Sequence, residues 1–177
     1  EIYTLSLHDA LPIFGRSIFS VYGTAERVAK EIARQTGSDI EEIVPEVPYD
    51  SDRSHYDELA RLAKREHGSD ARPAIKNRID ITDYDTIFVG FPMWWYTMPM
   101  IMYTLFDNLD FTGKTIVPFN THMGSRDGGT YLTIAGLEPG AKVLAGLPIE
   151  MSEAETGCAQ AVDEWLKKLG LDKEALV

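Results

Sequence analysis

The chain has 177 residues, 44% of them hydrophobic, and is therefore long enough to bury the core of one domain. Its 17 basic and 28 acidic residues give a formal net charge of -11, which disfavours nucleic acid and anionic membrane surfaces as partners. A single cysteine excludes an internal disulfide, and no apolar run approaches the roughly 18 residues of a membrane span, so we expect a cytoplasmic protein.

Residues 1–13 resemble the in-frame translation of a common sequencing-library adapter rather than a protein segment. We expect them to lie outside the fold, and we expect residues 14–177 to form one domain that lacks some native sequence at its start. Ser6, His8 and Asp9 do not indicate a hydrolase, because the members of a catalytic triad meet through a fold rather than through adjacency in sequence.

The turn at residues 20–25 follows a short predicted strand at residues 17–19 and precedes a helix that Gly37 ends. A strand, a turn with hydroxyl groups and a helix N-terminus together favour an anion site, because backbone N–H groups and the helix dipole converge there. The alternative is an ordinary N-cap by Thr24 with Gly23 as a turn residue. The segment itself leaves both interpretations open.

A second strand is predicted at residues 39–44 and a helix at residues 54–67. Tyr56, Leu59, Ala60 and Ala63 share one face of that helix. His55 and His67 are most simply interpreted as solvated residues.

Residues 85–100 read as strand, loop and helix. The apolar run at residues 86–89 is typical of a strand that is buried on both faces, and we expect Gly90 and Pro92 to end it. Pro99 suits the first turn of the next helix. Trp94, Trp95 and Tyr96 are thus predicted on a loop at the carboxyl end of a central strand, where open α/β sheets bind ligands. The alternative is that the two tryptophans are core aromatics.

A fourth strand at residues 114–120 contains Pro118, which removes a hydrogen bond from the ladder, so we expect a local irregularity there. The glycine-rich loop at residues 121–129 follows at another carboxyl strand end and is expected to border the same crevice. His122 is a weak catalytic candidate, because the sequence places no Asp, Cys or Ser partner with it.

The remaining pattern predicts a short helix at residues 131–135, a fifth strand at residues 142–144 and a final helix at residues 159–169, with Cys158 buried rather than catalytic. A βα unit that repeats five times indicates the α/β class. We expect a doubly wound parallel sheet of five strands with helices on both faces.

The chain resembles the flavodoxin-like family, specifically the bacterial FMN proteins with a Pro-x-Trp-Trp loop. The resemblance covers residues 20–169. Its motifs are Gly90-Phe-Pro-Met-Trp-Trp95 with Met98-Pro-Met100, Phe111-Thr-Gly-Lys-Thr115, Pro118-Phe-Asn-Thr-His122 and Pro139-Gly-Ala-Lys142.

The resemblance implies FMN as the cofactor, with no catalytic side chain and no metal. The implied phosphate-binding residues are Ser20, Tyr22, Gly23, Thr24 and Ala25; those beside the isoalloxazine ring are Pro92, Met93, Trp94, Trp95, Tyr96, Thr97, Thr121, His122, Met123, Gly124 and Ser125. The family form of the first turn is closer to Ser-x-Thr-Gly-Asn-Thr, so at least one hydroxyl donor is lost here. The run from Gly23 to Glu26 instead resembles the phosphate turn of diflavin reductases.

These features support an FMN protein that moves electrons, either as a carrier or as an NAD(P)H-dependent quinone or flavin reductase. Its partner would be a redox protein or a small-molecule electron acceptor. A cofactor-free flavodoxin-like binding module is the alternative, because fold does not fix function. A receiver-type domain is disfavoured, since the first strand end carries no acidic cluster.

We predict that deletion of residues 1–13 leaves the melting temperature of the protein unchanged, because a segment of adapter origin has no selected packing partners. Thermal unfolding of the full-length and shortened chains measures this. A fall of several degrees, which corresponds to about 1 kcal/mol in a domain of this size, would show that the segment packs on the fold.

Overall fold

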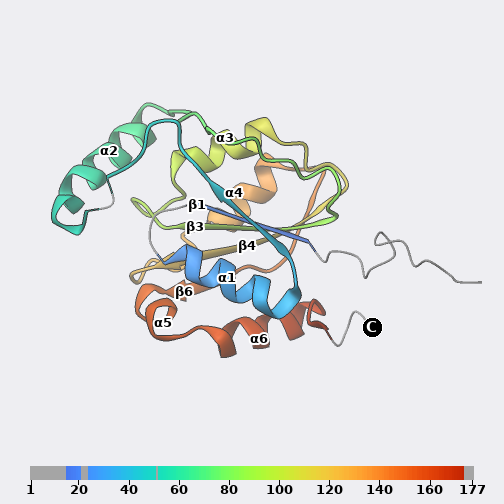
Figure 1. Cartoon of the computed structure of the whole chain (residues 1–177). Coiled ribbons are helices and arrows are strands. Elements are labelled where there is room, and N and C mark those ends of the chain that lie inside the picture. The colour runs from blue at the N-terminus through green and yellow to red at the C-terminus, as the bar shows by residue number, and fades with distance from the viewer. Residues whose placement is uncertain (1–14, 21–23, 51, 174–177) are drawn as a thin grey trace, which may run out of the picture.

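A parallel sheet of six strands forms the middle layer of the computed structural model, which describes residues 15–20, 24–50 and 52–173 (Figure 1). The strand order is β2-β1-β3-β4-β5, and β6 also pairs with β4. The strands are β1 (Arg16–Ser20), β2 (Asp39–Ile43), β3 (Thr86–Pro92), β4 (Thr115–His122), β5 (Lys142–Val143) and β6 (Leu147–Glu150). The order confirms the predicted doubly wound sheet and adds a sixth strand to it.

Helices cover both faces of this sheet, as predicted. The helices are α1 (Ala25–Thr36), the 3-10 turn η1 (Arg53–His55), α2 (Tyr56–Gly68), α3 (Met100–Asn108), α4 (Thr130–Leu137), α5 (Met151–Thr156) and α6 (Ala159–Leu169). In Figure 1, α1, α5 and α6 lie below the sheet and α3 and α4 lie above it, whereas α2 projects beyond the sheet to one side. Within the described residues no helix is long and apolar enough to span a bilayer.

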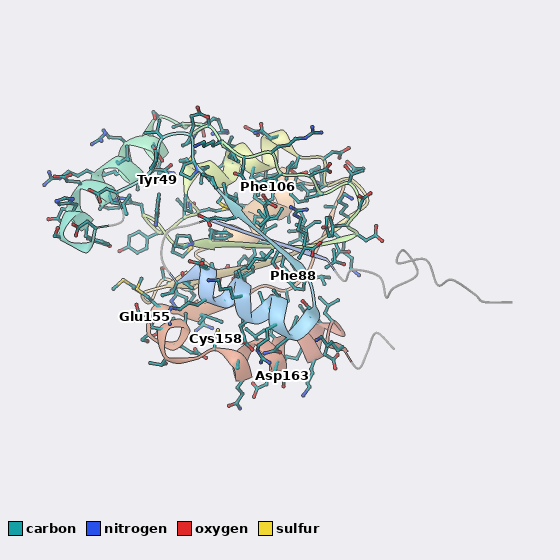
Figure 2. All side chains as sticks on the ribbon, viewed as in Figure 1. Tyr49, Phe88, Phe106, Glu155, Cys158 and Asp163 are labelled. Atoms are coloured by element: carbon teal, nitrogen blue, oxygen red, sulfur yellow. The ribbon has the colours of Figure 1, made fainter. Side chains whose placement is uncertain are left out.

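The strands β3 and β4 are buried on both faces, because consecutive residues alternate between two apolar cores. Ile87 and Val89 point into the core beneath α3 and α4, and Phe88 points into the core beside α1 and α6. Figure 2 shows Phe106 of α3 and Phe88 of β3 on opposite sides of the sheet. Cys158 is buried in the second core, as predicted, and burial raises the pKa of its thiol.

Of the two residues expected to end the third strand, Pro92 does end it and Gly90 does not, since β3 continues to Pro92, which pairs with Thr121 of β4. Gly90 is tolerated inside this strand because the ring of Phe119 fills the space that a β-carbon would occupy. The longer strand places Pro92 and Met93 at the carboxyl end of β3.

Pro118 lies opposite a break in the neighbouring strand. On that side β4 pairs with β5 through Thr115 and Ile116 and with β6 from Phe119 onward, so the residues around Pro118 have no strand partner. Ile116 accepts a hydrogen bond from Leu144 on this side, and backbone groups of alternate residues face the same way. The missing N–H of Pro118 therefore faces the gap, which explains why a central strand accommodates a proline.

The sequence pattern did not predict β6 and α5, which occupy residues 147–156 between the fifth predicted strand and the last helix. The expected apolar face of α2 is confirmed in part: Ala63 is buried, and Leu59 and Ala60 are half-buried. Tyr56 is 64% exposed, because the helix projects past the sheet instead of packing on it.

We predict that Gly90→Ala destabilises the protein by about 1–3 kcal/mol, because the added methyl group overlaps the Phe119 ring in a closely packed core. Urea unfolding measures the difference. Gly136→Ala in α4 is the matched control: its methyl group meets open space, and we expect a gain of about 0.5–1 kcal/mol. Equal stability of the Gly90 variant and the wild type would contradict the proposed packing of Phe119 on Gly90.

Candidate functional site

The carboxyl ends of β1, β3 and β4 meet at one edge of the sheet, and three chain segments leave from it. The strand order reverses between β1 and β3, and open α/β sheets bind ligands outside the strand ends at such a reversal. The segments are the turn before α1, the turn after β3 and the loop after β4. The predicted binding residues that the structure describes lie in these segments or at the ends of the elements beside them: Ser20 ends β1, Ala25 begins α1, Pro92 ends β3, and Thr121 and His122 end β4.

The N-terminus of α1 carries a buried hydroxyl, that of Thr24. Thr24 is 7% exposed and occupies the N-cap position, but its side chain makes no capping hydrogen bond. Its Oγ1 has no hydrogen-bond partner among the described residues. The structure therefore does not support the N-cap interpretation, and a polar group buried in this way needs a partner. Ala25 is buried at the first position of α1, and the predicted Tyr22 and Gly23 lie outside the described residues.

After β3 the chain makes a tight turn at residues 94–97. The Trp94 N–H donates to the Thr97 carbonyl at 2.8 Å, and the Thr97 N–H donates to the Trp94 carbonyl at 3.1 Å. The two central residues, Trp95 and Tyr96, have positive φ angles of 50° and 60°. Two left-handed residues at the centre define a type I′ turn, which glycine and asparagine usually occupy. Aromatic residues in this geometry are strained.

Both tryptophans of the turn are engaged by other parts of the chain. The Trp95 indole N–H donates to the carbonyl of Ala60 in α2, and the ammonium of Lys64 lies 5.2 Å from the centre of a Trp95 ring. Trp94 packs edge-to-face on Tyr49 with 5.2 Å between ring centres. The turn and α2 thus hold each other in place, which explains how α2 is fixed with little buried surface.

Tyr49 continues this connection to α2. Its hydroxyl donates to both carboxylate oxygens of Glu66, at 3.2 and 3.0 Å, and Figure 2 shows Tyr49 beside α2. Burial raises the pKa of Glu66, and the hydrogen bond from Tyr49 opposes this rise. The third aromatic of the turn, Tyr96, differs from both tryptophans because its side chain is 76% exposed. Among the described residues Tyr96 makes no hydrogen bond or ring contact. Of the three aromatic rings of the turn, that of Tyr96 is therefore the one available to a ligand.

The end of β4 carries a second buried hydroxyl, and the loop after it presents backbone groups. Thr121 is 1% exposed, and its Oγ1 also has no partner among the described residues. Its side chain lies on the same face of β4 as Val117 and Phe119, which is the face that α1 covers. His122 is buried, and its Nδ1 accepts the Gly124 N–H at 3.0 Å, so this nitrogen is not free to act as a base.

Two contacts join the β3 turn to the β4 loop. The Met93 N–H donates to the Thr121 carbonyl at 2.9 Å. Gly128 lies so close to the turn that a β-carbon there would be 2.7 Å from both the Met93 methyl group and the Tyr96 carbonyl oxygen. Met123 and Gly124 are exposed beside this contact, and Ser125 is half-buried. The structure therefore brings together the predicted segments at residues 92–97 and 121–125.

Sequence reasoning missed two polar residues behind this loop. Asn120 of β4 is 0% exposed; its Nδ2 donates to the carbonyl of Arg126 at 2.9 Å, and its Oδ1 accepts the hydroxyl proton of Tyr131 in α4. Burial raises the pKa of Tyr131, which keeps its hydroxyl protonated. An amide inside an apolar strand was the available signal, since buried amides need partners.

One further polar cluster and two surface cavities contain no predicted binding residue. Asp50, His55 and Glu58 have ligand atoms within 4.8 Å of one another, but all three residues are exposed. His55 pairs with Asp50 at 2.6 Å, and this hydrogen bond raises the pKa of His55. Two surface cavities of about 590 and 380 Å³ lie between α1 and α6 and between residues 75–82 and α3, respectively. Neither includes a predicted binding residue.

Residues 16–169 match the family model described as flavodoxin. The chain is similar to a candidate flavoprotein from Bacteroides eggerthii DSM 20697, with 28% identity, a TM-score of 0.73, and 87% of this chain and 95% of that chain covered. It is also similar to a candidate flavoprotein from Bacteroides uniformis ATCC 8492, with 27% identity, a TM-score of 0.76, and 86% of this chain and 97% of that chain covered. A flavoprotein in complex with FMN from Lactobacillus acidophilus NCFM has 21% identity and a TM-score of 0.63, with 80% of this chain and 96% of that chain covered. No curated protein matches the chain.

We predict that Tyr96→Gly is more stable than Tyr96→Ala by about 1 kcal/mol. Both variants lose the exposed ring, but only glycine adopts a positive φ without strain, so the difference isolates the strain of the turn. Urea unfolding of the two variants provides the measurement. An alanine variant as stable as the glycine variant would show that the turn stores no strain at residue 96.

Proposed function

The chain belongs to the flavodoxin family, and from this premise we propose that it binds FMN at the carboxyl edge of its sheet and transfers electrons through it. The observation that carries the proposal is the buried Oγ1 of Thr24 at the N-terminus of α1, which has no hydrogen-bond partner among the residues that the structure describes. A flavoprotein of the same fold from Lactobacillus acidophilus is in complex with FMN.

The α1 N-terminus fits the phosphate of FMN. A phosphate accepts hydrogen bonds, and Thr24 offers a buried hydroxyl beside the positive end of the helix dipole. The net charge of the protein is negative and does not attract a phosphate. Binding of a phosphate would therefore depend on local donors, namely backbone N–H groups and this hydroxyl. Ser20 ends β1 beside this site, and Tyr22 and Gly23 of the same turn lie outside the described residues.

The paired loops fit the ring of FMN. The turn at residues 94–97 offers a flat aromatic wall whose free ring is that of Tyr96, while Trp94 and Trp95 hold the turn against Tyr49 and α2. The loop at residues 121–125 offers backbone N–H groups to the polar edge of the ring. Among the described residues, the N–H groups of Met123 and Ser125 have no acceptor.

Bound FMN would supply one- and two-electron chemistry, and the residues of the chain would position it and set its electrostatic surroundings. Tyr96 would cover one face of the ring and limit its contact with water. His122 would act through the backbone geometry that its Nδ1 imposes on Gly124, rather than as an acid or base. The proposal therefore assigns no catalytic side chain and no metal.

The partner we propose is a redox protein or a small-molecule electron acceptor that reaches the ring beside Tyr96 and Met123, both of which are exposed. A reducing compartment such as the cytoplasm suits the free thiol of Cys158. A cofactor-free binding module remains the alternative reading of the altered phosphate turn. It gives no role to the buried hydroxyl of Thr24 and is therefore the weaker proposal.

We predict that Thr24→Val weakens FMN binding by about tenfold, the effect of losing one hydrogen bond to a charged group, and leaves riboflavin binding unchanged. Riboflavin lacks the phosphate, so only FMN senses this hydroxyl. Quenching of flavin fluorescence during titration measures both affinities.

Thr104→Val in α3 is the matched control. Thr104 is also a buried threonine whose Oγ1 has no partner among the described residues, but it lies on the other face of the sheet from α1. We expect the loss of the Thr104 hydroxyl to leave FMN affinity unchanged. Equal losses of FMN and riboflavin affinity in Thr24→Val would mean that residue 24 does not contact the phosphate. Failure of the wild type to bind FMN would support the cofactor-free module.

A further inference from the structure

The loop at residues 123–129 has little regular structure of its own, and the side chain of Asn120 in β4 holds it through a hydrogen bond. Gly124, Arg126, Gly128 and Gly129 all have positive φ angles, and Arg126, with a φ of 54°, is the residue among them that pays a steric penalty. The bonds within the loop are short-range, such as Gly128 N–H to the Ser125 carbonyl at 3.2 Å. A loop of this kind keeps one conformation only when the surrounding structure imposes it.

Asn120 supplies that constraint at the strained residue. The Arg126 carbonyl can only accept, so the Asn120 amide must direct its nitrogen to it, and the amide oxygen must then face Tyr131. The Tyr131 hydroxyl consequently donates. Each of these two hydrogen bonds therefore has one allowed direction, and together they fix the orientation of the Asn120 amide.

The support continues behind Tyr131. Its ring lies against Gly146, in the segment that links β5 to β6, and leaves no space there for a β-carbon. The ring position therefore depends on residues that belong neither to the loop nor to the proposed ring site. Gly146 thus leaves room for the Tyr131 ring, the Tyr131 hydroxyl orients the Asn120 amide, and this amide binds the Arg126 carbonyl.

We propose that Asn120, oriented by Tyr131, is the positioning residue that aims the backbone N–H groups of Met123 and Ser125 at the polar edge of the flavin ring. This inference rests on the proposed function and adds two residues that do not touch the cofactor. N–H groups directed at this edge favour negative charge there, so their placement affects both ring affinity and the reduction potential of bound FMN.

The experiment compares Asn120→Leu and Tyr131→Phe with Tyr84→Phe. Asn120→Leu removes both hydrogen bonds with little change in volume, and Tyr131→Phe removes only the hydroxyl, so it stays informative if the first variant fails to fold. Tyr84→Phe is the control, because the Tyr84 hydroxyl donates to Asp39 near the start of β2, at the opposite edge of the sheet.

The first readout is hydrogen exchange in the flavin-free proteins. We expect the amide hydrogens of Gly128 and Thr130, which donate to Ser125 and Asp127, to exchange about tenfold faster in Tyr131→Phe than in the wild type. The amides of β1 and β3 should be unaffected. Unchanged exchange in the loop would overturn the proposed constraint by Asn120, whatever the protein binds.

The second readout is flavin binding and potential. We expect both variants to bind FMN and riboflavin about tenfold more weakly, by equal factors, because the loop contacts the ring they share. The reduction potential of bound FMN should fall relative to that of Tyr84→Phe. Faster loop exchange with unchanged affinities and potential would overturn the inference and leave FMN binding intact. A wild type that binds neither flavin would overturn the proposed function and this inference together.

Discussion

The burial of β3 and β4 on both faces confines polar contacts with a ligand to the ends of these strands. Inside the sheet their side chains alternate between two apolar cores, and even Gly90 is needed to admit the Phe119 ring. Polar groups therefore collect where the strands end, with Thr24, Thr121 and His122 at one edge. The strand order places this edge at the reversal between β1 and β3, so the position of the site follows from the packing of the sheet.

The turn after β3 combines strain with anchoring. Positive φ angles at Trp95 and Tyr96 are unfavourable for residues with β-carbons, and the contacts of Trp94 and Trp95 with Tyr49 and α2 hold the turn in this conformation. The result is an exposed Tyr96 ring on a turn whose backbone contacts the β4 loop. The two tryptophans that stand out in the sequence thus serve the geometry of the turn, and the residue after them is the one left free.

The sequence predicted much of the fold because its periodicities and turn residues are strong. The helix that ends at Gly37 and the final helix at residues 159–169 were confirmed, and so was the parallel sheet. The exposure of α2 was not predicted, because its apolar face gives no sign that the helix lies beyond the sheet. The break between β5 and β6 was missed for a similar reason: Pro118 indicated an irregularity, but strand pairing decides which strand is interrupted. Asn120 and Tyr131 were missed because their hydrogen bonds join β4, the loop and α4, whose positions only the fold defines.

The central claim is that FMN binds at this edge with its phosphate at α1 and its ring between the two loops. NMR of the isotopically labelled protein during titration with FMN and with riboflavin tests it most directly. We predict that FMN shifts the amide signals of Thr24, Ala25 and residues 121–125, and that riboflavin shifts those of residues 121–125 but not those of Thr24 and Ala25. Amide signals at this edge that stay unchanged with both flavins would contradict the proposed position of FMN.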